Sequence, residues 1–503
     1  MNLDWIKTIN RKYLIYGGAA CVVFLFSFVI LFDGCAPSKP YPVLVGGIPD
    51  NEMRPEKWGE VYPLEYKSWL KTKEPREKAR SRYKRGWDTD KIVWDKLSEF
   101  PFMALLFNGF GFGIEYNEPR GHYYMMIDQR EIDQSRTKAG GACLACKSPY
   151  ANKFYEEMGK ELFKLSYADA VAKIPKEHQD MGVSCIDCHD NRNMDLKVGR
   201  WTVKGGLKAL GKDEFARQEM RSVVCAQCHV TYFIPKDDKG VSSDVVFPWA
   251  GSTWGNISVE NIIKVLLSSP ANREWKQATT GFKLPFIRHP EFEFFTMQST
   301  HFKAGLACAD CHMPYRREGG FKISDHNIMS PIKDDLRACA NCHPQSKDRL
   351  RDSVFAIQDR IVSLLNRAGY AAAGTAKLFE MVHAQQAAGK AIDQALYAKA
   401  KEFYEEALLR GIFIGAENSI GFHNPTEAGR ILGDAIAFSM RAEALLREAL
   451  MQAGVQVPEV VQLELPKYLN NRGSKHLNFQ PGHEIKDPYG TSDRLQPAIS
   501  KGI

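Results

Sequence analysis

Ten of the twelve cysteines in this chain of 503 residues fall into five pairs, each with two residues between the cysteines. In a C-x-x-C-H motif the two thiols form thioethers to haem, and the adjacent imidazole is an axial ligand of the iron. Zinc ribbons and redox proteins also use C-x-x-C pairs. Histidine follows four of these five pairs, although the chain has only 13 histidines, and this favours haem over zinc or disulfides. The pattern predicts five covalently bound haem c groups, attached at Cys143/Cys146/Lys147, Cys185/Cys188/His189, Cys225/Cys228/His229, Cys308/Cys311/His312 and Cys339/Cys342/His343.

Lys147 stands in the first motif where the other four motifs have histidine. A lysine amine must lose its proton before it can bind a metal, which a buried iron centre can enforce. A haem that only relays electrons is best served by two strong axial ligands, whereas a catalytic haem keeps one position open for substrate. We therefore interpret the first haem as the catalytic one, with Lys147 as its proximal ligand. The alternatives are a first motif without haem, or another residue as the axial ligand.

The first 34 residues are predicted to be a membrane anchor. A basic segment ending at Lys12 precedes an uncharged run over residues 13–32. About 20 apolar residues match a bilayer core, whereas the apolar part of a cleaved signal peptide has about 7–15. Positive charge before the span places the rest of the chain outside the cytoplasm, so we expect it on the periplasmic side of the cytoplasmic membrane. A cleaved signal peptide and lipidation of Cys35 are the alternatives.

Composition excludes two classes of protein. Hydrophobic content of 44% and charged content of 25% are those of a globular protein and not of a polytopic membrane protein. A net charge of +7, from 67 basic and 60 acidic residues, comes without a long basic run, which argues against a nucleic-acid partner.

The pattern of turns and apolar residues divides the chain into three parts after the anchor. Residues 35–345 contain all five motifs and are rich in turn residues, with little strand-like alternation. Residues 346–457 have apolar residues at three- and four-residue spacing, which indicates long amphipathic helices. Residues 458–503 are expected to form an extended tail on the surface. We predict a mainly α multihaem cytochrome c with a haem-packed core and little β structure, whose long helices pack on the haem region or form a dimer interface.

Several further segments give the chain a resemblance to a known family. These are NEPRGHYY, CLACKSP, CAQCHVTYF, RHPEFE, SDHNI and FHNP, in that order. The chain resembles the pentahaem ammonia-forming cytochrome c nitrite reductases. The resemblance implies an enzyme that reduces nitrite to ammonium with six electrons, a homodimer, and an electron donor that is a quinol-oxidising multihaem cytochrome of the membrane. The alternatives are an electron-transfer cytochrome without a substrate of its own, or a reductase of hydroxylamine or sulfite.

The resemblance also implies which side chains surround the substrate. Matching motif by motif gives Arg136, Tyr232 and His289 as catalytic residues beside Lys147. Arg130 is the alternative to Arg136, because the segment between His122 and the first motif differs in length from that of the family. Arginine and histidine can hydrogen-bond bound oxygens, and tyrosine can donate a proton.

Spacing alone cannot choose second axial ligands among the nine histidines outside the motifs. The resemblance implies that His122 binds the third haem, His301 the fifth, His326 the second and His423 the fourth. His178, His383, His476 and His483 are then left without an assigned role.

The chain departs from the family at a calcium site. Many members bind calcium beside the active haem through a glutamate before the catalytic tyrosine and a glutamine before the catalytic histidine. Thr231 and Arg288 occupy these positions here. Losing a carboxylate and gaining a guanidinium disfavours calcium, and Arg288 can supply positive charge itself. We therefore predict an enzyme without calcium at this site.

Overall fold

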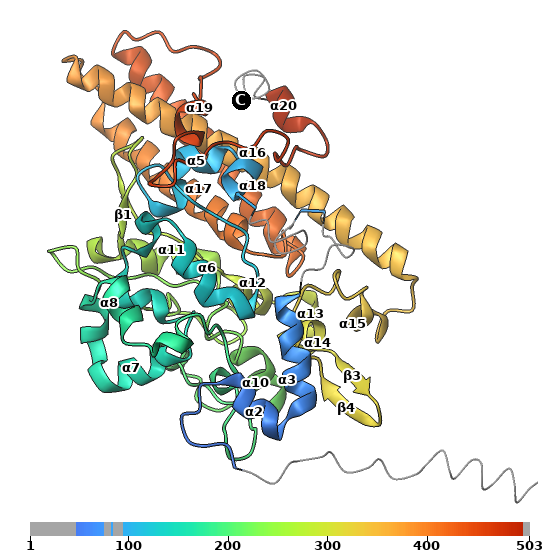
Figure 1. Ribbon diagram of the computed structural model, residues 1–503. Coiled ribbons are helices and arrows are strands. Elements are labelled where there is room, and N and C mark those ends of the chain that lie inside the picture. Colours follow the sequence, from blue (N-terminus) through green and yellow to red (C-terminus); the bar gives the residue numbers. More distant parts are fainter. Residues whose placement is uncertain (1–46, 75–81, 84–93, 496–503) are drawn as a thin grey trace, which may run out of the picture.

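The computed structural model describes residues 47–74, 82–83 and 94–495. Three long helices lie side by side along one flank of the molecule (Figure 1), and α18 packs against both of the others. They are α16 (Lys347–Ala387), α17 (Gln394–Ala416) and α18 (Pro425–Gln452). The mainly helical fold predicted from the sequence is confirmed.

Local sequence sets the bounds of these three helices. Ser346, Asp393 and Asn424 each precede a helix, and each side chain accepts a hydrogen bond from a backbone N–H of the first turn. Such caps satisfy donors that have no partner inside the helix. Gly389 follows α16 at φ +83° and Gly454 follows α18 at φ +70°, where a glycine avoids the strain of a left-handed residue.

The rest of the described chain folds mainly into short helices joined by turns. These α-helices are α2 (Pro55–Val61), α3 (Pro63–Leu70), α4 (Lys96–Glu99), α5 (Phe102–Leu106), α6 (Met125–Glu131), α7 (Tyr150–Met158), α8 (Tyr167–Ala172), α9 (Trp201–Ala209), α10 (Arg217–Val223), α11 (Val259–Leu267), α12 (Glu291–Thr296), α13 (Thr300–Lys303), α14 (Cys308–His312), α15 (Arg337–Ala340), α19 (Pro466–Leu469) and α20 (Thr491–Leu495). The 3-10 helices are η2 (Lys71–Lys73), η5 (Gly111–Gly113), η6 (His122–Tyr124), η7 (Gln134–Thr137), η8 (Gly140–Leu144), η9 (Gly159–Lys164), η10 (Lys176–His178), η11 (Cys185–Asp187) and η12 (Pro270–Asn272).

The strands in the described part of the chain form two antiparallel pairs. Strand β1 (Trp275–Lys276) pairs with β2 (Lys283–Leu284). Strand β3 (Tyr315–Glu318) pairs with β4 (Phe321–Ser324) through a two-residue turn whose Gly319 has φ +60°. Little of the chain is therefore β structure, as the lack of alternation in the sequence predicts.

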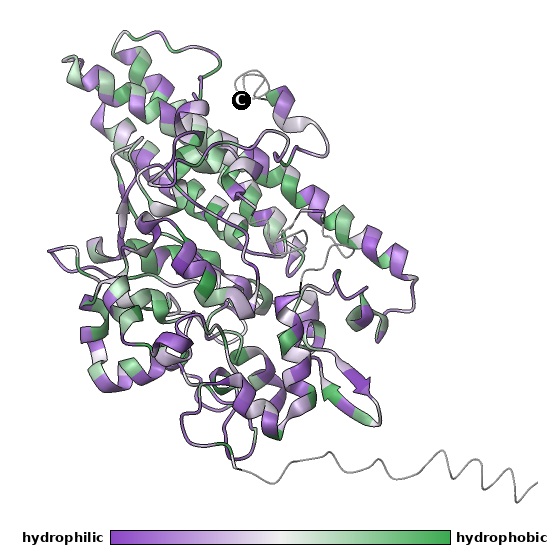
Figure 2. Cartoon of the chain, viewed as in Figure 1, coloured by the Kyte–Doolittle hydropathy of each residue, from purple (hydrophilic) through white to green (hydrophobic). Residues whose placement is uncertain are grey.

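The long helices bury one face each. In α16 the side chains of Ile361, Leu365, Ala368 and Ala372 are buried at three- and four-residue intervals, which places them on one stripe of the helix. Figure 2 shows hydrophobic residues mixed with hydrophilic ones along all three helices. The buried stripe joins a hydrophobic core that continues into α5, α11 and α12. The bundle is thus packed on the part of the chain that carries the cysteine motifs.

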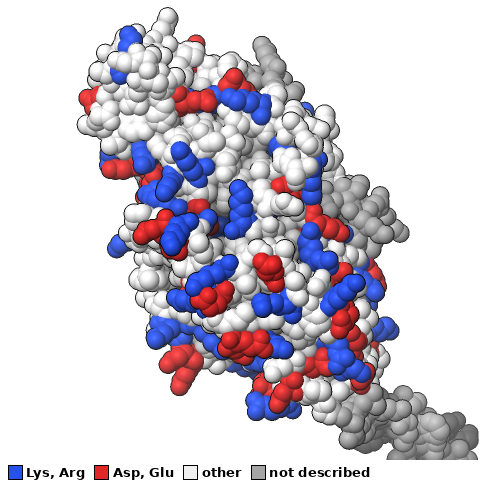
Figure 3. All heavy atoms as spheres, turned by 60° about the vertical axis from the view of Figure 1, so that its left-hand side comes forward, with Lys and Arg blue, Asp and Glu red and all other residues white. Residues whose placement is uncertain are grey.

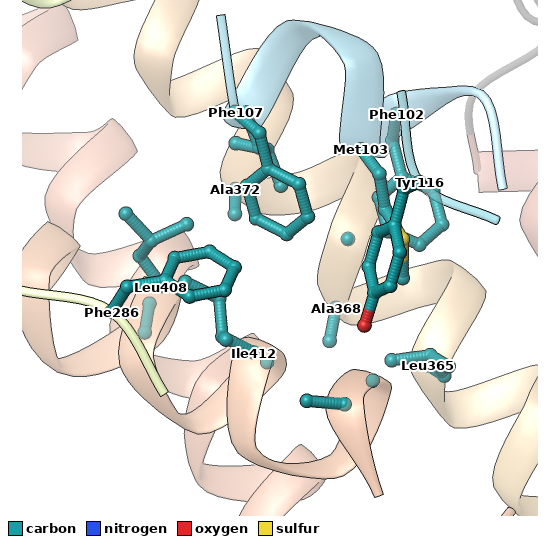
Figure 4. A pocket seen from close by; sticks show the side chains of 16 residues that line it. Phe102, Met103, Phe107, Tyr116, Phe286, Leu365, Ala368, Ala372, Leu408 and Ile412 are labelled. Atoms are coloured by element: carbon teal, nitrogen blue, oxygen red, sulfur yellow. The ribbon is translucent and has the colours of Figure 1, made fainter. Parts of the chain in front are cut away.

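A small cavity lies where α5 meets α16 and α17 (Figure 4). Its volume is about 20 Å³, close to that needed by a single water, and its lining includes Phe107, Tyr116, Phe286, Leu408 and Ile412. Apart from this cavity, which is lined mostly by apolar side chains, the interface between the three long helices and the motif region is close-packed.

The C-terminal tail does more than follow the surface. Leu465, Tyr468, Leu469 and Arg472 are buried, and α19 packs on α5. Further along, the Ile485 N–H donates to the carbonyl of Glu99 at 2.9 Å. The tail is held in this way because its apolar side chains close the core beside α5.

Figure 3 shows lysine, arginine, aspartate and glutamate side chains interspersed over one face of the molecule, without a large area of a single sign. The predicted anchor, residues 1–34, and Cys35 lie outside the described residues. Among the residues that the structure describes, we find no helix with the length and apolar character needed to span a bilayer.

Gly411 offers a test of the packing at the interface between the long helices and the motif region. It lines the cavity from α17, and an added Cβ would meet no heavy atom outside its own stretch of helix within 4 Å. Because alanine is favoured over glycine inside a helix by about 0.8–1.0 kcal/mol, Gly411→Ala should raise the free energy of unfolding by about 1 kcal/mol. The measurement is urea unfolding followed by far-ultraviolet circular dichroism.

Gly369 in α16 is the matched control. A Cβ at Gly369 would lie 2.3 Å from Cε2 of Phe102, so Gly369→Ala should lower the free energy of unfolding by about 1–3 kcal/mol. If both variants were destabilised, the cavity beside Gly411 would not be open to a methyl group.

Candidate haem-binding and active site

Each cysteine motif that ends in histidine folds as one helical turn. The histidine N–H donates to the carbonyl of the first cysteine at 2.9 Å in the second, third and fifth motifs, and the fourth motif forms α14. Residues three and four positions apart lie on the same face of a helix. One turn therefore places both thiols and the imidazole on one side, as attachment of a planar cofactor requires.

Four motif histidines each lie opposite a second histidine from a distant part of the chain. The distances between ring centroids are 6.1 Å for His122 and His229, 6.1 Å for His189 and His326, 6.1 Å for His312 and His423, and 6.3 Å for His301 and His343. These are the histidines, and the pairings, that the family resemblance implies.

The spacing within these pairs fits a metal between the two rings. Two metal–imidazole bonds of about 2.1 Å, plus roughly 1.1 Å from each nitrogen to its ring centre, separate the centroids by roughly 6.4 Å. The observed distances of 6.1–6.3 Å are within a few tenths of this value. The residues present therefore fit iron bound by two histidines.

Hydrogen bonds fix the orientation of several of these imidazoles. Nδ1 of His312 lies 2.8 Å from the Met329 carbonyl, and Nδ1 of His423 lies 2.6 Å from Oε1 of Glu417. His189 and His326 likewise use Nδ1 toward backbone carbonyls. An Nδ1–H donated in this way leaves Nε2 as the atom free to bind a metal.

None of the ten motif cysteines forms a disulfide, and some of them lie next to a cysteine of another motif. Cys146 of the first motif is close to Cys228 of the third, and Cys225 of the third is close to Cys308 of the fourth. Since each thiol marks the edge of an attached haem, the first, third and fourth haems would lie in succession.

Cys342 of the fifth motif is exposed, whereas the other nine motif cysteines are partly buried. It lies in a run of exposed residues, 340–349, that leads from α15 into the first turn of α16. Attachment of haem at Cys342 stays a prediction, which the 6.3 Å pairing of His343 with His301 supports.

A buried ion pair joins the second motif to the first. The side chain of Arg200 is 1% exposed and pairs with Asp187, which lies inside the second motif. The same guanidinium donates to the carbonyl of Ser148, next to Lys147, at 2.8 Å. Arg200 therefore ties the two motifs together.

The surroundings of Lys147 differ from those of the four motif histidines. Its Nζ lies 3.3 Å from Sδ of Met125, and no histidine ring is paired with the first motif among the residues that the structure describes. Burial lowers the pKa of His289, and the positive charges of Lys147 and Arg136 lower it further. Lys147 and Arg136 therefore both lie within electrostatic range of His289, and Lys147 is also within range of His122 and His229.

Arg136 lies in η7 and is held from two sides. Its guanidinium lies 3.5 Å from the centroid of the Phe112 ring and donates to the backbone carbonyl of Glu115. Burial lowers the pKa of Arg136 to about 10, so the group remains protonated at neutral pH. The charge of Arg136 also interacts with Tyr232, which places the tyrosine near the same site.

Arg130, the alternative to Arg136, lies elsewhere. It belongs to α6, its side chain is 39% exposed, and it forms an ion pair with Asp180. The geometry favours Arg136 as the arginine beside the first motif.

Tyr232 lies beside Arg288. The Arg288 guanidinium carbon is 4.9 Å from the centroid of the Tyr232 ring, and one of its nitrogens donates to the Tyr232 backbone carbonyl at 3.2 Å. Burial raises the pKa of Tyr232 above its usual value, and the positive charge of Arg288 opposes this shift. The phenol is therefore protonated at neutral pH.

His289 has an unusual backbone. Its φ is +44°, a conformation that costs free energy for any residue other than glycine. Burial is the main cause of the lowering of its pKa, so the imidazole is neutral at pH 7.

The residues at the calcium position form a buried ion pair. Arg288 donates to both carboxylate oxygens of Glu274, at 2.8 and 2.6 Å, and both side chains are at most 6% exposed. The backbone N–H of Arg288 donates to Oγ1 of Thr231 at 3.2 Å. The guanidinium thus lies between a carboxylate and the Tyr232 carbonyl, two groups that otherwise suit a cation.

Sequence reasoning missed Glu274 and Glu417. Neither lies in a cysteine motif. The partners that give them a place at the site, Arg288 for Glu274 and His423 for Glu417, are 14 and 6 residues away, so no local pattern marks them. Glu293 lies in the RHPEFE segment, but the sequence alone assigned no role to it. Burial raises the pKa of Glu293 to about 8, while its carboxylate accepts hydrogen bonds from Trp249 and from the Thr231 N–H.

Comparison with known proteins gives matches over most of the chain. The family model described as cytochrome c552 matches residues 54–498. The chain is 30% identical to cytochrome c-552 of Bacteroides fragilis (strain YCH46) over 90% of this chain and 89% of that protein. It is 32% identical to cytochrome c-552 of Aliarcobacter butzleri (strain RM4018) over 80% and 78%.

A solved structure is also similar. It is the cytochrome c nitrite reductase from Desulfovibrio desulfuricans ATCC 27774, which is described with two calcium sites in its catalytic subunit, NrfA. The TM-score is 0.73 at 28% sequence identity, and the match covers 87% of this chain and 98% of that one.

The pair of Arg288 and Glu274 generates a test of the site's architecture. Removing one partner leaves the other charge buried alone, so Arg288→Met should lower the free energy of unfolding by about 3–5 kcal/mol. The double variant Arg288→Met/Glu274→Leu removes both charges and should recover most of that loss. Urea unfolding of the unaltered protein, Arg288→Met, Glu274→Leu and the double variant measures the coupling. Additive losses in the double variant would contradict a direct ion pair.

Proposed function

Because the chain belongs to the cytochrome c552 family, we propose that it is a cytochrome c nitrite reductase that converts nitrite to ammonium. One observation carries the proposal. Four motif histidines lie opposite a second histidine, whereas in the described part of the chain no second histidine lies opposite Lys147, whose Nζ is 3.3 Å from Sδ of Met125. A reductase of this kind needs haem sites that relay electrons and one haem site that binds the substrate anion. The four histidine pairs suit the first task, and the Lys147 motif suits the second.

We assign the residues that hold the cofactors as follows. The ten motif cysteines attach five haem c groups, with Lys147, His189, His229, His312 and His343 as proximal ligands and His326, His122, His423 and His301 as distal ligands of the second, third, fourth and fifth haems. When bound, these haems supply electrons and the iron centre at which the substrate is reduced.

The protein's own residues supply charge and protons. Conversion of nitrite takes up six electrons and eight protons and yields ammonium and two waters. Arg136, protonated at neutral pH, would bind the oxygens of the nitrite anion by charge-assisted hydrogen bonds. Tyr232, whose raised pKa keeps the phenol protonated, would donate a proton. The neutral imidazole of His289 would hold a hydrogen bond to the same oxygens and pass on protons.

We also propose that no calcium ion is needed at Thr231 and Arg288. The similar reductase from Desulfovibrio desulfuricans is described with two calcium sites. In this chain Arg288 already places a fixed positive charge against Glu274 and the Tyr232 carbonyl. A guanidinium in this position would replace the positive charge of the calcium ion and, through the Tyr232 carbonyl, keep Tyr232 in position.

The assembly and location are proposed from the sequence and the bundle. An anchor over residues 13–32 would hold the protein on the periplasmic side of the cytoplasmic membrane, near a quinol-oxidising multihaem cytochrome as donor. Helix α18 exposes Met440 and Met451, at 63% and 68%, and large exposed apolar side chains on a helix support a homodimer through this bundle.

The proposed reaction can be tested directly. With a reduced viologen as donor, the purified holoprotein should convert nitrite to ammonium and consume six electrons for each ammonium formed. Consumption of viologen with hydroxylamine or sulfite but not with nitrite would change the substrate. If viologen were consumed with none of the three substrates, the alternative of an electron-transfer cytochrome without its own substrate would be favoured.

The two arginines provide a matched pair for this assay. Arg136→Gln should raise the KM for nitrite by about tenfold or more, because a charge-assisted hydrogen bond contributes about 1.5–3 kcal/mol. Arg130→Gln removes the same charge from α6 and should leave the KM unchanged. The reverse result would make Arg130 the binding residue.

Independence from calcium gives a separate prediction. Incubation with EGTA should leave the nitrite reductase activity unchanged, because Arg288 supplies the charge. The double variant Thr231→Glu/Arg288→Gln introduces the residues that calcium-binding members use, and its activity should fall with EGTA and return with calcium. A fall in the activity of the unaltered protein that calcium reverses would contradict the role of Arg288.

A further inference from the structure

Four residues of the C-terminal tail, Arg472 to Lys475, contact the segments on either side of Arg136. We call these four residues the C-terminal strap. The guanidinium of Arg472 pairs with Asp95 and donates to the carbonyl of Ile114 at 2.8 Å. Arg472 is 5% exposed. Arg472 therefore anchors the strap beside Glu115, whose carbonyl accepts the hydrogen bond of Arg136, while Ser474 and Lys475 lie at the surface.

Ser474 of the strap binds the residue that caps the turn of Arg136. One carboxylate oxygen of Asp133 accepts hydrogen bonds from the N–H and the hydroxyl of Ser474, at 2.9 and 2.8 Å. The other oxygen accepts from the N–H of Ser135 at 2.9 Å, as the N-cap of η7. The Arg136 N–H donates to the Asp133 carbonyl at 2.9 Å. Ser474 and Arg136 are thus joined through a single aspartate.

Lys475 binds the second carboxylate beside Arg136. Its Nζ lies 3.0 Å from Oε1 of Glu115 and also donates to the carbonyl of Glu131. The other oxygen of Glu115 accepts the Asp133 N–H at 2.5 Å. Glu115 and Asp133 are both 3% exposed, so each depends on the strap for part of its hydrogen bonding.

Gly473 allows this close approach. Its φ is +65°, and an added Cβ would lie 2.4 Å from Cγ2 of Ile114 and 2.5 Å from Oδ2 of Asp133. No other residue fits between the strap and the cap of η7 without displacing one of them.

We propose that the C-terminal strap positions Arg136 for substrate binding, with Ser474 and Lys475 as positioning residues that act through Asp133 and Glu115. The proposal rests on the proposed function of Arg136 as the group that binds nitrite. The chain end, more than 330 residues away in sequence, would then set how well the site binds an anion.

Adding one methyl group at Gly473 should displace the strap. Gly473→Ala should push Ser474 away from Asp133 and loosen η7. Gly482→Ala is the matched control, because Gly482 lies in the same tail at φ +82° but has no heavy atom within 4 Å of an added Cβ. Both variants place an alanine at positive φ and so carry the same kind of backbone strain, but only Gly473→Ala would displace Asp133, the N-cap of η7.

Two measurements on the holoprotein test the idea. Hydrogen exchange followed by mass spectrometry should show faster exchange in the peptide around residues 133–137 for Gly473→Ala and not for Gly482→Ala. The KM for nitrite should rise about tenfold, whereas the KM for hydroxylamine, which is neutral at pH 7, should change little. A general loss of structure would raise both KM values.

The outcomes distinguish the proposed effect of the strap on η7 from the proposed function of Arg136. Unchanged hydrogen exchange at residues 133–137 would contradict the effect of the strap on η7. Faster exchange with an unchanged ratio of the two KM values would overturn its positioning role. If Arg136→Gln itself left the ratio unchanged, the proposed function of Arg136 would fail, whatever the exchange result.

Should Gly473→Ala fail to fold, Lys475→Met serves in its place. It removes the cation from Glu115 while keeping the length of the side chain, and Lys486→Met, at an exposed lysine of the same tail, is its control. Lys475→Met combined with Arg136→Gln should raise the nitrite KM no further than Arg136→Gln alone. Independent, additive effects of the two substitutions would contradict action through Arg136.

Discussion

The distance of 6.1–6.3 Å between paired imidazoles is the constraint on which the rest of the fold depends. Each pair joins a motif histidine to a residue between 42 and 137 positions away. Seven of the eight paired histidines lie in the motif region, which leaves little room there for long regular elements. The short helices and turns between residues 94 and 345 follow from this requirement, because each turn must present thiols and imidazole to one cofactor face.

The long helices meet a different requirement. They have caps, glycine ends and a buried stripe of their own, so they gain stability from packing that owes nothing to cofactors. One of the paired histidines, His423, lies in the short link between α17 and α18 and is oriented by Glu417. The bundle therefore both covers the motif region and fixes one imidazole from outside it.

Buried ion pairs connect these parts around the first motif. Arg200 with Asp187 joins two motifs, Arg288 with Glu274 supports Tyr232, and Arg472 with Asp95 holds the tail. Burying charges is costly unless each has a well-placed partner. Such pairs bring little net stability compared with apolar contacts, but they tolerate only one arrangement. They are suited to a site where the position of Arg136 or Tyr232 matters more than overall stability.

The sequence by itself determined the local chemistry of this protein. A cysteine, a second cysteine three residues on and a histidine at the next position lie on one face of a helical turn, so the motifs and their cofactor could be predicted without a fold. The same holds for the long helices, whose periodicity and caps are local. Spacing could not choose the second histidines, and only a family resemblance proposed them. The tertiary structure brought those histidines together, favoured Arg136 over Arg130, and brought Glu274 beside Tyr232 and the C-terminal strap beside Asp133. These depend on contacts between residues far apart in the chain, and no local pattern encodes where a distant carboxylate or chain end will lie.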